Sequence, residues 1–434
     1  MARGLTLPGV RAPSHLSIDA ARMHDHSWRM AIRLASLPLC LLIGLTGATS
    51  AHAQTQIDES IEVLGSRPGS VRAIRDSGST VRRDTIERRQ PLDLYETIGD
   101  TAGVAIEGGP RSSGKTISIR GFSDNEDILT RIDGATQNFE KYRYGSSLEI
   151  DPDLVRQVDI LRGAATLVEG AGALGGIVLA ETLDAGDLLR PGQRYGVRTR
   201  LAYTTNDDGQ RGSVSVYGRP LDNVDLLASG VMRETNALEL PDRSRLADSA
   251  EALWSGLFKA SGNTAYGEWR AVHRRGEAER LEPFDASGGA PGLFGTVRRR
   301  TEDAATVLGL RSNTGRSWRD AEATLGYTDK RVTDLASRTA GGTALGTDEF
   351  DYGIWTLDLR NDVGHRWGAI EGSLRVGLQG NRELRTAVRT NALGRRVNEA
   401  QPPGAKKSWG GVLFETLRWG DVEINGGARF DHYQ

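Results

Sequence analysis

The pattern of apolar and polar residues becomes strictly alternating after residue 195. In residues 369–381 the even positions from Ile370 to Leu378 are apolar or small, whereas most odd positions are polar. Residues 321–328 and 355–360 also alternate, in the opposite phase. A period of two predicts a strand with one apolar and one polar face. Roughly eleven such segments, separated by turn residues, are typical of a transmembrane β-barrel and not of a helical protein.

Residues 81–184 have shorter and more varied segments. Residues 84–88 and 93–98 predict two short helices on either side of Pro91, and Asp93 is placed to cap the second. A third helix is predicted at residues 153–157. Short runs rich in β-branched residues predict strands at residues 104–106, 117–119, 128–132, 158–161 and 177–179. This part of the chain is therefore expected to be a compact mixed α and β unit.

The N-terminal residues predict export from the cytoplasm. Residues 30–53 have a positive start, an apolar middle at residues 34–45 and a close of small residues, which is the layout of a signal peptide. The apolar part is shorter than the roughly 20 residues that span a bilayer. Residues 1–29 are expected to be a mis-assigned leader, with translation starting at Met30. Cys40 lies in the signal segment, so the mature chain is expected to form no disulfide.

Composition narrows the class of protein. The formal net charge is −2 and the arginines are dispersed, so nucleic-acid binding is not expected. Residues 170–175 match the dinucleotide pattern G-x-G-x-x-G, but a strand is predicted after them where that pattern needs a helix. No zinc-ligand spacing, nucleophile elbow or P-loop occurs in the sequence. We therefore expect no enzyme, and a nucleotide-dependent enzyme remains only a remote alternative.

Four phrases in the mixed unit share an order and spacing with a known family. They are ISIRG at residues 117–121, ILTRIDG at 128–134, VDILRG at 158–163 and GAGALGG at 170–176. Together they resemble the plug domain of TonB-dependent outer-membrane receptors. The resemblance implies an α+β plug domain at residues 80–190, followed by mainly antiparallel β structure at 191–434 that forms part of a transmembrane barrel. It also implies a place in the outer membrane of a Gram-negative bacterium, in contact with its lipid.

The resemblance implies active import of a nutrient. Residues 54–79 are expected to be a periplasmic arm, and its run Ile61, Glu62, Val63 and Leu64 resembles the TonB box. In the family this box adds a strand to TonB, the partner that belongs to the inner-membrane energy-coupling complex. An ordinary linker with one apolar run is the alternative. Arg120 and Arg162 each precede a glycine at a strand end, and they are expected to pair with barrel carboxylates and hold the plug.

The ligand implied by the resemblance is haem. Residues 131–139, with 151–154 and 184–192, look most like the receptors for haem and haemoglobin, in which a plug histidine commonly binds haem iron. The corresponding loop here has no histidine, so the candidate ligand-binding residues are Tyr142, Arg143 and Tyr144. Tyrosine can bind ferric haem, and arginine can pair with a propionate. The alternative is that these three side chains are ordinary exposed loop residues or face a barrel loop.

A ferric-siderophore receptor of the same architecture is the alternative to a receptor for haem or for haem iron from haemoproteins. Haem would be a transported ligand and not a permanently bound cofactor, and the metal-binding residues are unknown. Among the histidines of the second half, His365 fits a turn beside Gly364 better than a pore site, and His432 is expected to be structural.

The number of predicted strands is about half of what a plugged barrel uses. Such barrels need about 22 strands, whereas roughly eleven are predicted here. The sequence is therefore expected to be the N-terminal half of a longer receptor, interrupted within a strand at residues 424–434. An open barrel leaves unpaired backbone groups in hydrocarbon. We predict that the 434 residues alone do not form a working receptor.

Overall fold

The computed structural model describes nine segments of the chain. They are residues 78–123, 127–137, 148–162, 166–170, 173–286, 295–312, 320–338, 344–397 and 403–434. All of them belong to one compact unit, residues 62–434. The predicted leader and signal peptide, nearly all of the predicted arm, and the loop with Tyr142 lie outside the described residues, so those predictions remain untested.

The first two helices follow the sequence prediction. Strand β1 is Ser79–Arg82, helix α3 is Arg83–Arg89 and helix α4 is Leu94–Ile98. The Asp93 carboxylate caps α4 by accepting from the backbone N–H of Glu96 at 2.8 Å, and the Glu96 carboxylate accepts from that of Leu92 at 2.9 Å. These contacts satisfy donors that a helix start leaves without partners, which explains why the helix begins at Leu94.

The seven strands β1 to β7 form two small sheets, one of five strands and one of two. Their bounds are β2 Val104–Glu107, β3 Thr116–Ile119, β4 Ile128–Ile132, β5 Ala135–Thr136, β6 Val155–Arg162 and β7 Gly176–Thr182. The order in the five-stranded sheet is β1-β6-β7-β4-β5, where β4 and β7 are parallel, and β2 pairs with β3. The core of this unit is made by side chains with almost no exposure, such as Ile132, Val158 and Val178.

The helix predicted at residues 153–157 is wrong. A single 3₁₀ turn, η4 Pro152–Leu154, is followed directly by β6. Asp151 caps this turn through the backbone N–H of Asp153 at 2.8 Å. Val155 and Val158 are completely buried, and a β-branched run packs better as a strand between two neighbours than as a helix. Other short elements are η3 Ser112–Gly114, α5 Thr166–Glu169 and α6 Ala185–Leu188.

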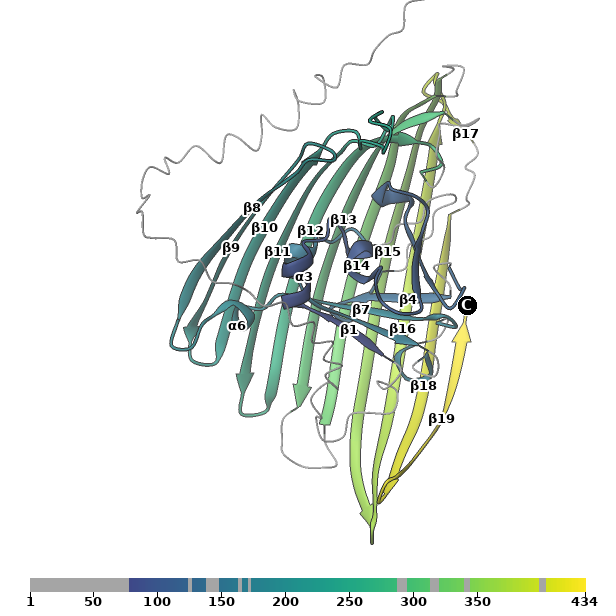
Figure 1. The fold of residues 1–434 in the computed structure, drawn as a ribbon. Coiled ribbons are helices and arrows are strands. Elements are labelled where there is room, and N and C mark those ends of the chain that lie inside the picture. Colours follow the sequence, from purple (N-terminus) through teal and green to yellow (C-terminus); the bar gives the residue numbers. More distant parts are fainter. Residues whose placement is uncertain are drawn as a thin grey trace, which may run out of the picture. The chain divides into compact units, whose positions relative to one another are not determined.

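A large antiparallel sheet follows, with strands that run side by side from teal to yellow in Figure 1. Its strands are β8 Tyr195–Thr204, β9 Gly209–Leu221, β10 Val224–Thr235, β11 Glu251–Thr264, β12 Gly267–Pro283, β13 Thr296–Ser312, β14 Asp320–Arg338, β15 Ala344–Trp367, β16 Ile370–Thr390, β17 Arg396–Val397, β18 Gly404–Trp419 and β19 Val422–Tyr433. Eleven form a continuous path in sequence order, and the short β17 pairs beside β16. The strand pattern predicted from alternation is confirmed.

The two faces of the large sheet differ in polarity. On one face Leu201, Phe258 and Leu310 are 90%, 51% and 62% exposed, whereas Leu257 and Lys259 on the opposite face of β11 are buried. The exposed apolar face suits contact with lipid, and Trp367 and Trp419 lie at strand ends as an interfacial girdle requires. Among the described residues, no helix has the length and apolar character to cross a bilayer.

The connections differ in length between the two ends of the large sheet. Residues 222–223, 265–266, 368–369 and 420–421 make tight turns at one end, here called the turn end. Residues 236–250, 284–295 and 391–403 make longer connections at the opposite end, here called the loop end. Membrane barrels of β-strands commonly have short turns at one end and longer loops at the other, and these connections have the same asymmetry.

Candidate functional site

The site is the interface between the plug, residues 79–188, and the polar face of the large sheet. Apolar contacts lie at its centre, where Leu148 and Leu154 of the plug belong to one core cluster with Leu227, Val231 and Leu257 of the sheet. Charged side chains surround this centre. The polar face of the sheet therefore lies against the plug, and several of its charged side chains bind plug residues.

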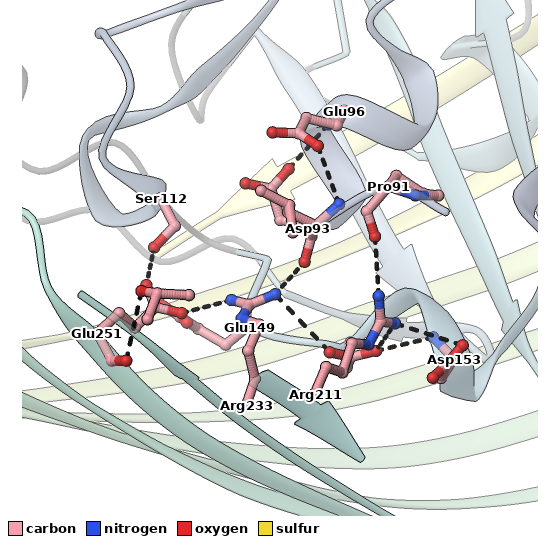
Figure 2. A network of polar contacts seen from close by, with 12 residues as sticks. Pro91, Asp93, Glu96, Ser112, Glu149, Asp153, Arg211, Arg233 and Glu251 are labelled. Carbon is pink, nitrogen blue, oxygen red and sulfur yellow. Dashed lines mark hydrogen bonds and ion pairs between the residues drawn. The ribbon is translucent and has the colours of Figure 1, made fainter. Parts of the chain in front are cut away.

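The first group of charges is the arginine cluster, formed by Arg211, Arg233 and Arg280 on β9, β10 and β12. Figure 2 shows Arg211 and Arg233 with their partners. Arg211 donates to the Asp151 carboxylate and, at 3.0 Å, to the Pro91 carbonyl of the plug.

Arg233 donates to the Leu92 carbonyl and to Glu251 on β11, with Asp151 at 3.8 Å. Arg280 donates to Glu251 at 2.7 Å and to Glu149 of the plug at 2.9 Å. Sheet arginines thus hold the plug segment 148–154 through its carboxylates.

The second group is the Asp358 cluster, in which Asp358 on β15 receives hydrogen bonds from both sides of the interface. Arg131 on β4 donates to its Oδ2 at 2.9 Å, and Arg360 donates to the same oxygen at 2.7 Å. Arg360 also binds both oxygens of Glu169 in α5, each at 3.0 Å. Gln379 links Asp358 to the plug backbone, donating to Asp358 at 3.0 Å and to the Val168 carbonyl at 3.1 Å.

A third contact is made by the turn between β4 and β5, at Asp133 and Gly134. The Asp133 carboxylate accepts from the backbone N–H and the hydroxyl of Thr182, at 3.0 and 2.9 Å, and so ties the end of β7 to the turn. Gly134 has φ of +90°, and a Cβ there would lie 3.1 Å from Cγ2 of Thr324 on β14. A glycine at this position permits both the backbone conformation and the close approach to the sheet.

The plug segment Arg111–Lys115 holds the loop end of the sheet. Arg111 donates to the carbonyls of Asp248 and Ala247, at 2.7 and 2.8 Å, in the connection before β11. Ser112 donates to Glu251, and Ser113 donates to Glu282 at the end of β12. The plug therefore contacts the base of the long connections directly, so a change in those connections would reach the plug.

Two plug carboxylates, Asp151 and Glu169, have pKa values shifted in opposite directions. Burial raises the pKa of Asp151 above its ordinary 3.8, although Arg211 and Arg233 oppose that shift. Burial would also raise the pKa of Glu169, but the charge of Arg360 and its hydrogen bonds outweigh it, so this pKa lies below 4.5. Ion pairing therefore keeps Glu169 charged despite its burial.

An interface held by buried ion pairs determines the position of the plug more than it stabilises the complex. Removing one partner of a buried ion pair costs about 3–5 kcal/mol, because the other charge loses its compensation. A complete pair, by contrast, is close to neutral relative to an apolar replacement, since both charges gave up hydration to form it. Such contacts fix one docked position of the plug. Separating the whole plug from the sheet, with both partners of each pair returning to water, costs comparatively little free energy.

Most residues singled out from the sequence are not tested by these contacts. Ile61 to Leu64 and Tyr142 to Tyr144 lie outside the described residues. Arg162 donates to Ser79 within the plug at 3.0 Å, and Arg120 has φ of +55° at an exposed strand end. Their pairing with barrel carboxylates stays a prediction.

Arg131, Glu169 and Asp151 were not predicted from the sequence as docking residues. Arg131 had a visible signal: it lies within the otherwise apolar run 128–132, where a buried arginine requires an anionic partner. Asp151 and Glu169 carried no comparable signal, because each lies directly before a turn-forming residue, Pro152 or Gly170, where an exposed polar side chain is ordinary.

The histidines of the large sheet do not form a metal site in the part of the chain that the structure describes. His365 lies within β15, so its assignment to a turn is wrong, and its Nε2 is 2.9 Å from Oε1 of Glu415. His273 contacts Thr306 at 3.0 Å, and His432 lies against Trp409 with ring centroids 5.7 Å apart. The described residues contain no group of three or more His, Cys, Asp or Glu placed to hold a metal ion.

Comparisons with known proteins agree with this architecture. Residues 70–177 match the family described as TonB-dependent Receptor Plug Domain. The chain is 32% identical over 233 residues to TonB-dependent heme receptor A of Haemophilus ducreyi, a match that covers 54% of the chain and 31% of that protein. It is 28% identical over 421 residues to the hemin receptor of Yersinia enterocolitica, covering 92% and 57%.

A solved structure shares the fold. The hemophore receptor HasR of Serratia marcescens, determined in complex with its hemophore HasA and heme, superposes with a TM-score of 0.68 at 20% identity, covering 82% of this chain and 52% of HasR. The chain therefore spans about a third to just over half of the length of these relatives.

The plug, docked by ion pairs against the polar face of an antiparallel sheet with an exposed apolar face, has the architecture of a plug domain and part of a β-barrel. The matching plug family and the similar receptors make the assignment more specific. Residues 70–177 match the plug domain of TonB-dependent receptors, and the chain is similar to such receptors in sequence and in fold.

Proposed function

We propose that this chain belongs to a receptor that imports haem, or haem iron taken from haemoproteins, across the outer membrane. Force that TonB transmits from the inner membrane drives the import. The supporting observation is the plug, which blocks the polar side of the sheet and is held there by the arginine and Asp358 clusters. The choice of haem rests on similar proteins named heme receptor A and hemin receptor.

The proposed mechanism has three steps. Ligand binds at the loop end, the run Ile61 to Leu64 then pairs as an added strand with TonB, and the pull that follows rearranges the plug. An interface made of ion pairs suits the third step, because water can replace the lost partners as the contacts open.

The proposed function uses the domain boundaries that were predicted from the sequence. Residues 30–53 would direct export, 54–79 would form the periplasmic arm, 80–190 the plug and 191–434 the first part of the barrel. Tyr142, Arg143 and Tyr144 remain the proposed contacts for the ligand. The receptor would lie in the outer membrane and carry no permanently bound cofactor.

A ferric-siderophore receptor is the second candidate. The observation in its favour is the lack of any histidine in residues 80–190, because the haem branch commonly uses a plug histidine as an iron ligand. The two candidates share the same plug and sheet, so only the ligand separates them.

A growth experiment in the source bacterium decides between the candidates. The chromosomal gene is deleted, and growth in iron-depleted medium is measured with haemin, haemoglobin or ferric siderophores as the iron source. Haem import predicts a growth defect with haemin and haemoglobin that reintroduction of the gene repairs. A defect confined to ferric siderophores would support the second candidate instead.

A further inference from the structure

One arginine joins the start of the described plug to the segment that the sheet holds. Arg83 is the first residue of α3, directly after β1, and its side chain is 15% exposed. Its Nη1 donates to the backbone carbonyls of Pro152, Asp153 and Val155, at 3.0, 3.3 and 2.9 Å, in the turn η4 and directly after it. The side chain therefore links α3 to a turn that lies 69 to 72 positions later in the chain.

The guanidinium of Arg83 is also held from its other edge. Its Nε donates to Glu87, one turn later on α3, at 2.7 Å, and Arg198 on β8 donates to the same Glu87 oxygen at 2.6 Å. A planar guanidinium that binds carbonyls on one edge and a carboxylate on another leaves only when several charge-assisted hydrogen bonds break together. Arg83 is therefore a firm attachment between α3 and η4.

The strand before Arg83 is attached by far fewer contacts. β1 has four residues and pairs with β6 at the edge of the five-stranded sheet, from Ser79 opposite Ile160 to Arg82 opposite Gln157. The chain before Ser79 includes the run that is proposed to pair with TonB, so a pull on that run reaches the described structure at Ser79. A short edge strand can detach one residue pair at a time. The Arg83 contacts are then the first firm point that the pull meets.

From η4 the pull passes to ion pairs between the plug and the sheet. Asp153 of η4 accepts from Arg200 on β8, and Asp151, which caps η4, accepts from Arg211 on β9. The plug members of the Asp358 cluster lie on other elements, β4 and α5. A displacement of η4 therefore strains the pairs around the segment 148–154 before it strains the Asp358 cluster.

We propose that Arg83 passes the TonB-transmitted pull to the segment 148–154, so that this segment is the first part of the plug to leave the sheet. The inference rests on the proposed function and identifies the contact through which the third step of the mechanism begins. Arg83 is a positioning residue in this step, because it acts through η4 and not on the ligand.

A thiol beneath the segment 148–154 would report its departure. Ser229 lies between Leu227 and Val231 on β10, shares their face of the strand and is 9% exposed. In S229C a maleimide reaches the thiol when the segment has moved away. Thr356 on β15 is 1% exposed and accepts from the backbone N–H of Thr136 on β5 at 3.1 Å, so T356C reports the other half of the interface in the same way.

Each thiol variant is built into the chromosomal gene alone, with R83Q and with R88Q. R88Q is the matched control, because it makes the same change on the same helix, where Arg88 and Asp84 form an exposed pair. Whole cells receive haemin and a maleimide, both in a strain with TonB and in a strain that lacks it. Mass spectrometry of the labelled peptide gives the rate, and haemin binding to isolated outer membranes is measured alongside.

The expected result with TonB and haemin is faster labelling of S229C than of T356C. R83Q should slow the TonB-dependent labelling of S229C about tenfold, the order of effect that loss of a charge-assisted contact produces, whereas R88Q should leave it unchanged. Haemin should bind equally well to every variant, because binding precedes the pull. The direction of the change is decisive: if Arg83 only held the plug in place, its removal would speed the labelling of S229C, even in cells that lack TonB.

Three outcomes overturn the inference. Unchanged labelling of S229C in R83Q would mean that the pull does not pass through Arg83. Faster labelling of S229C in R83Q without TonB would make Arg83 a structural contact. Equal labelling of T356C and S229C would mean that both halves of the interface separate together. Failure of the proposed function is a different result: the unmodified receptor would support no growth on haemin, haemin would change no labelling rate, and the inference would fall with it.

Discussion

At the scale of single residues, the docked position of the plug depends on side chains that contact several partners at once. Asp358 accepts from Arg131 of the plug at 2.9 Å, and from Arg360 and Gln379 of the sheet at 2.7 and 3.0 Å. Asp358 and Arg131 are both almost completely buried. Water cannot compensate either charge in the docked state, so both depend on the polar partners that the interface supplies.

Replacing Asp358 with alanine is expected to destabilise the docked plug strongly. The change leaves the buried Arg131 with only the more distant Glu169 carboxylate, 4.0 Å away, which should lower the free energy of unfolding by about 3–5 kcal/mol. Denaturant unfolding of the detergent-solubilised protein measures the loss. The matched control is D351A, seven positions earlier on β15, whose partner Arg331 forms a half-exposed pair. That control should lose no more than about 1 kcal/mol, and an equal loss in both would contradict the role given to Asp358.

The low pKa of Glu169 predicts a specific dependence on pH. Because the folded-state pKa is depressed, the charged carboxylate stabilises the docked plug above pH 4.5, and this contribution disappears as the pH falls through the lower folded-state value. E169Q should therefore be less stable than the wild type at pH 7, with a difference that shrinks at pH 3. Denaturant unfolding at the two pH values measures it.

The control for that prediction is E181Q, since Glu181 pairs with Arg156 in a contact where both side chains are about two-fifths exposed. Its effect on stability should be small at both pH values. If E169Q differs from the wild type by the same amount at pH 3 and pH 7, the Arg360 contact does not control the charge of Glu169.

At the scale of elements, the sequence predicted those features that depend on neighbouring residues alone, such as the start of helix α4. Asp93 and Glu96 are three residues apart, and the capped start of α4 was visible from that spacing. The helix predicted at 153–157 was wrong, because the burial of Val155 and Val158 between β1 and β7 is a tertiary effect. The partners in the site could not be predicted for the same reason. Arg131 and Asp358 are 227 positions apart, and the pairing of the ten strands between β4 and β15 decides whether they meet.

The turn between β4 and β5 gives an element-scale prediction for G134A. Gly134 and Gly121 have nearly the same φ, +90° and +88°, so alanine should strain the backbone equally at both, by about 1 kcal/mol. A Cβ at position 134 lies 3.1 Å from Thr324 on β14, whereas one at position 121 meets nothing within 4 Å. G134A should therefore lower stability more than G121A, as measured by the urea midpoint.

A second substitution isolates the contact between the turn and the sheet. T324S removes the Cγ2 atom that a Cβ at position 134 approaches, so G134A/T324S should recover to the level of G121A. Equal losses for G134A and G121A in the wild-type background would mean that the turn does not press against β14.

At the scale of the whole molecule, the arrangement raises the question of whether import requires the plug to leave its docked position. A covalent link across the interface tests this directly. A Cβ at Gly326 on β14 would lie 2.7 Å from Cβ of Ala135 on β5, and disulfides need about 3.8 Å between Cβ atoms. A retreat of roughly 1 Å by β5 would accommodate A135C/G326C, and the oxidising periplasm would form the bond.

Under the proposed function, the oxidised A135C/G326C receptor should bind haemin in isolated outer membranes but fail to support growth on it. Reduction with a mild thiol should restore growth, because it frees β5 from β14 without changing any other contact. The single variants A135C and G326C should import normally in both conditions, which excludes an effect of the substitutions alone. If the oxidised double variant grows at the wild-type rate, the ligand passes while β5 stays docked against β14. The force on the plug would then have to move another part of it, for example the segment 148–154 held by the arginine cluster.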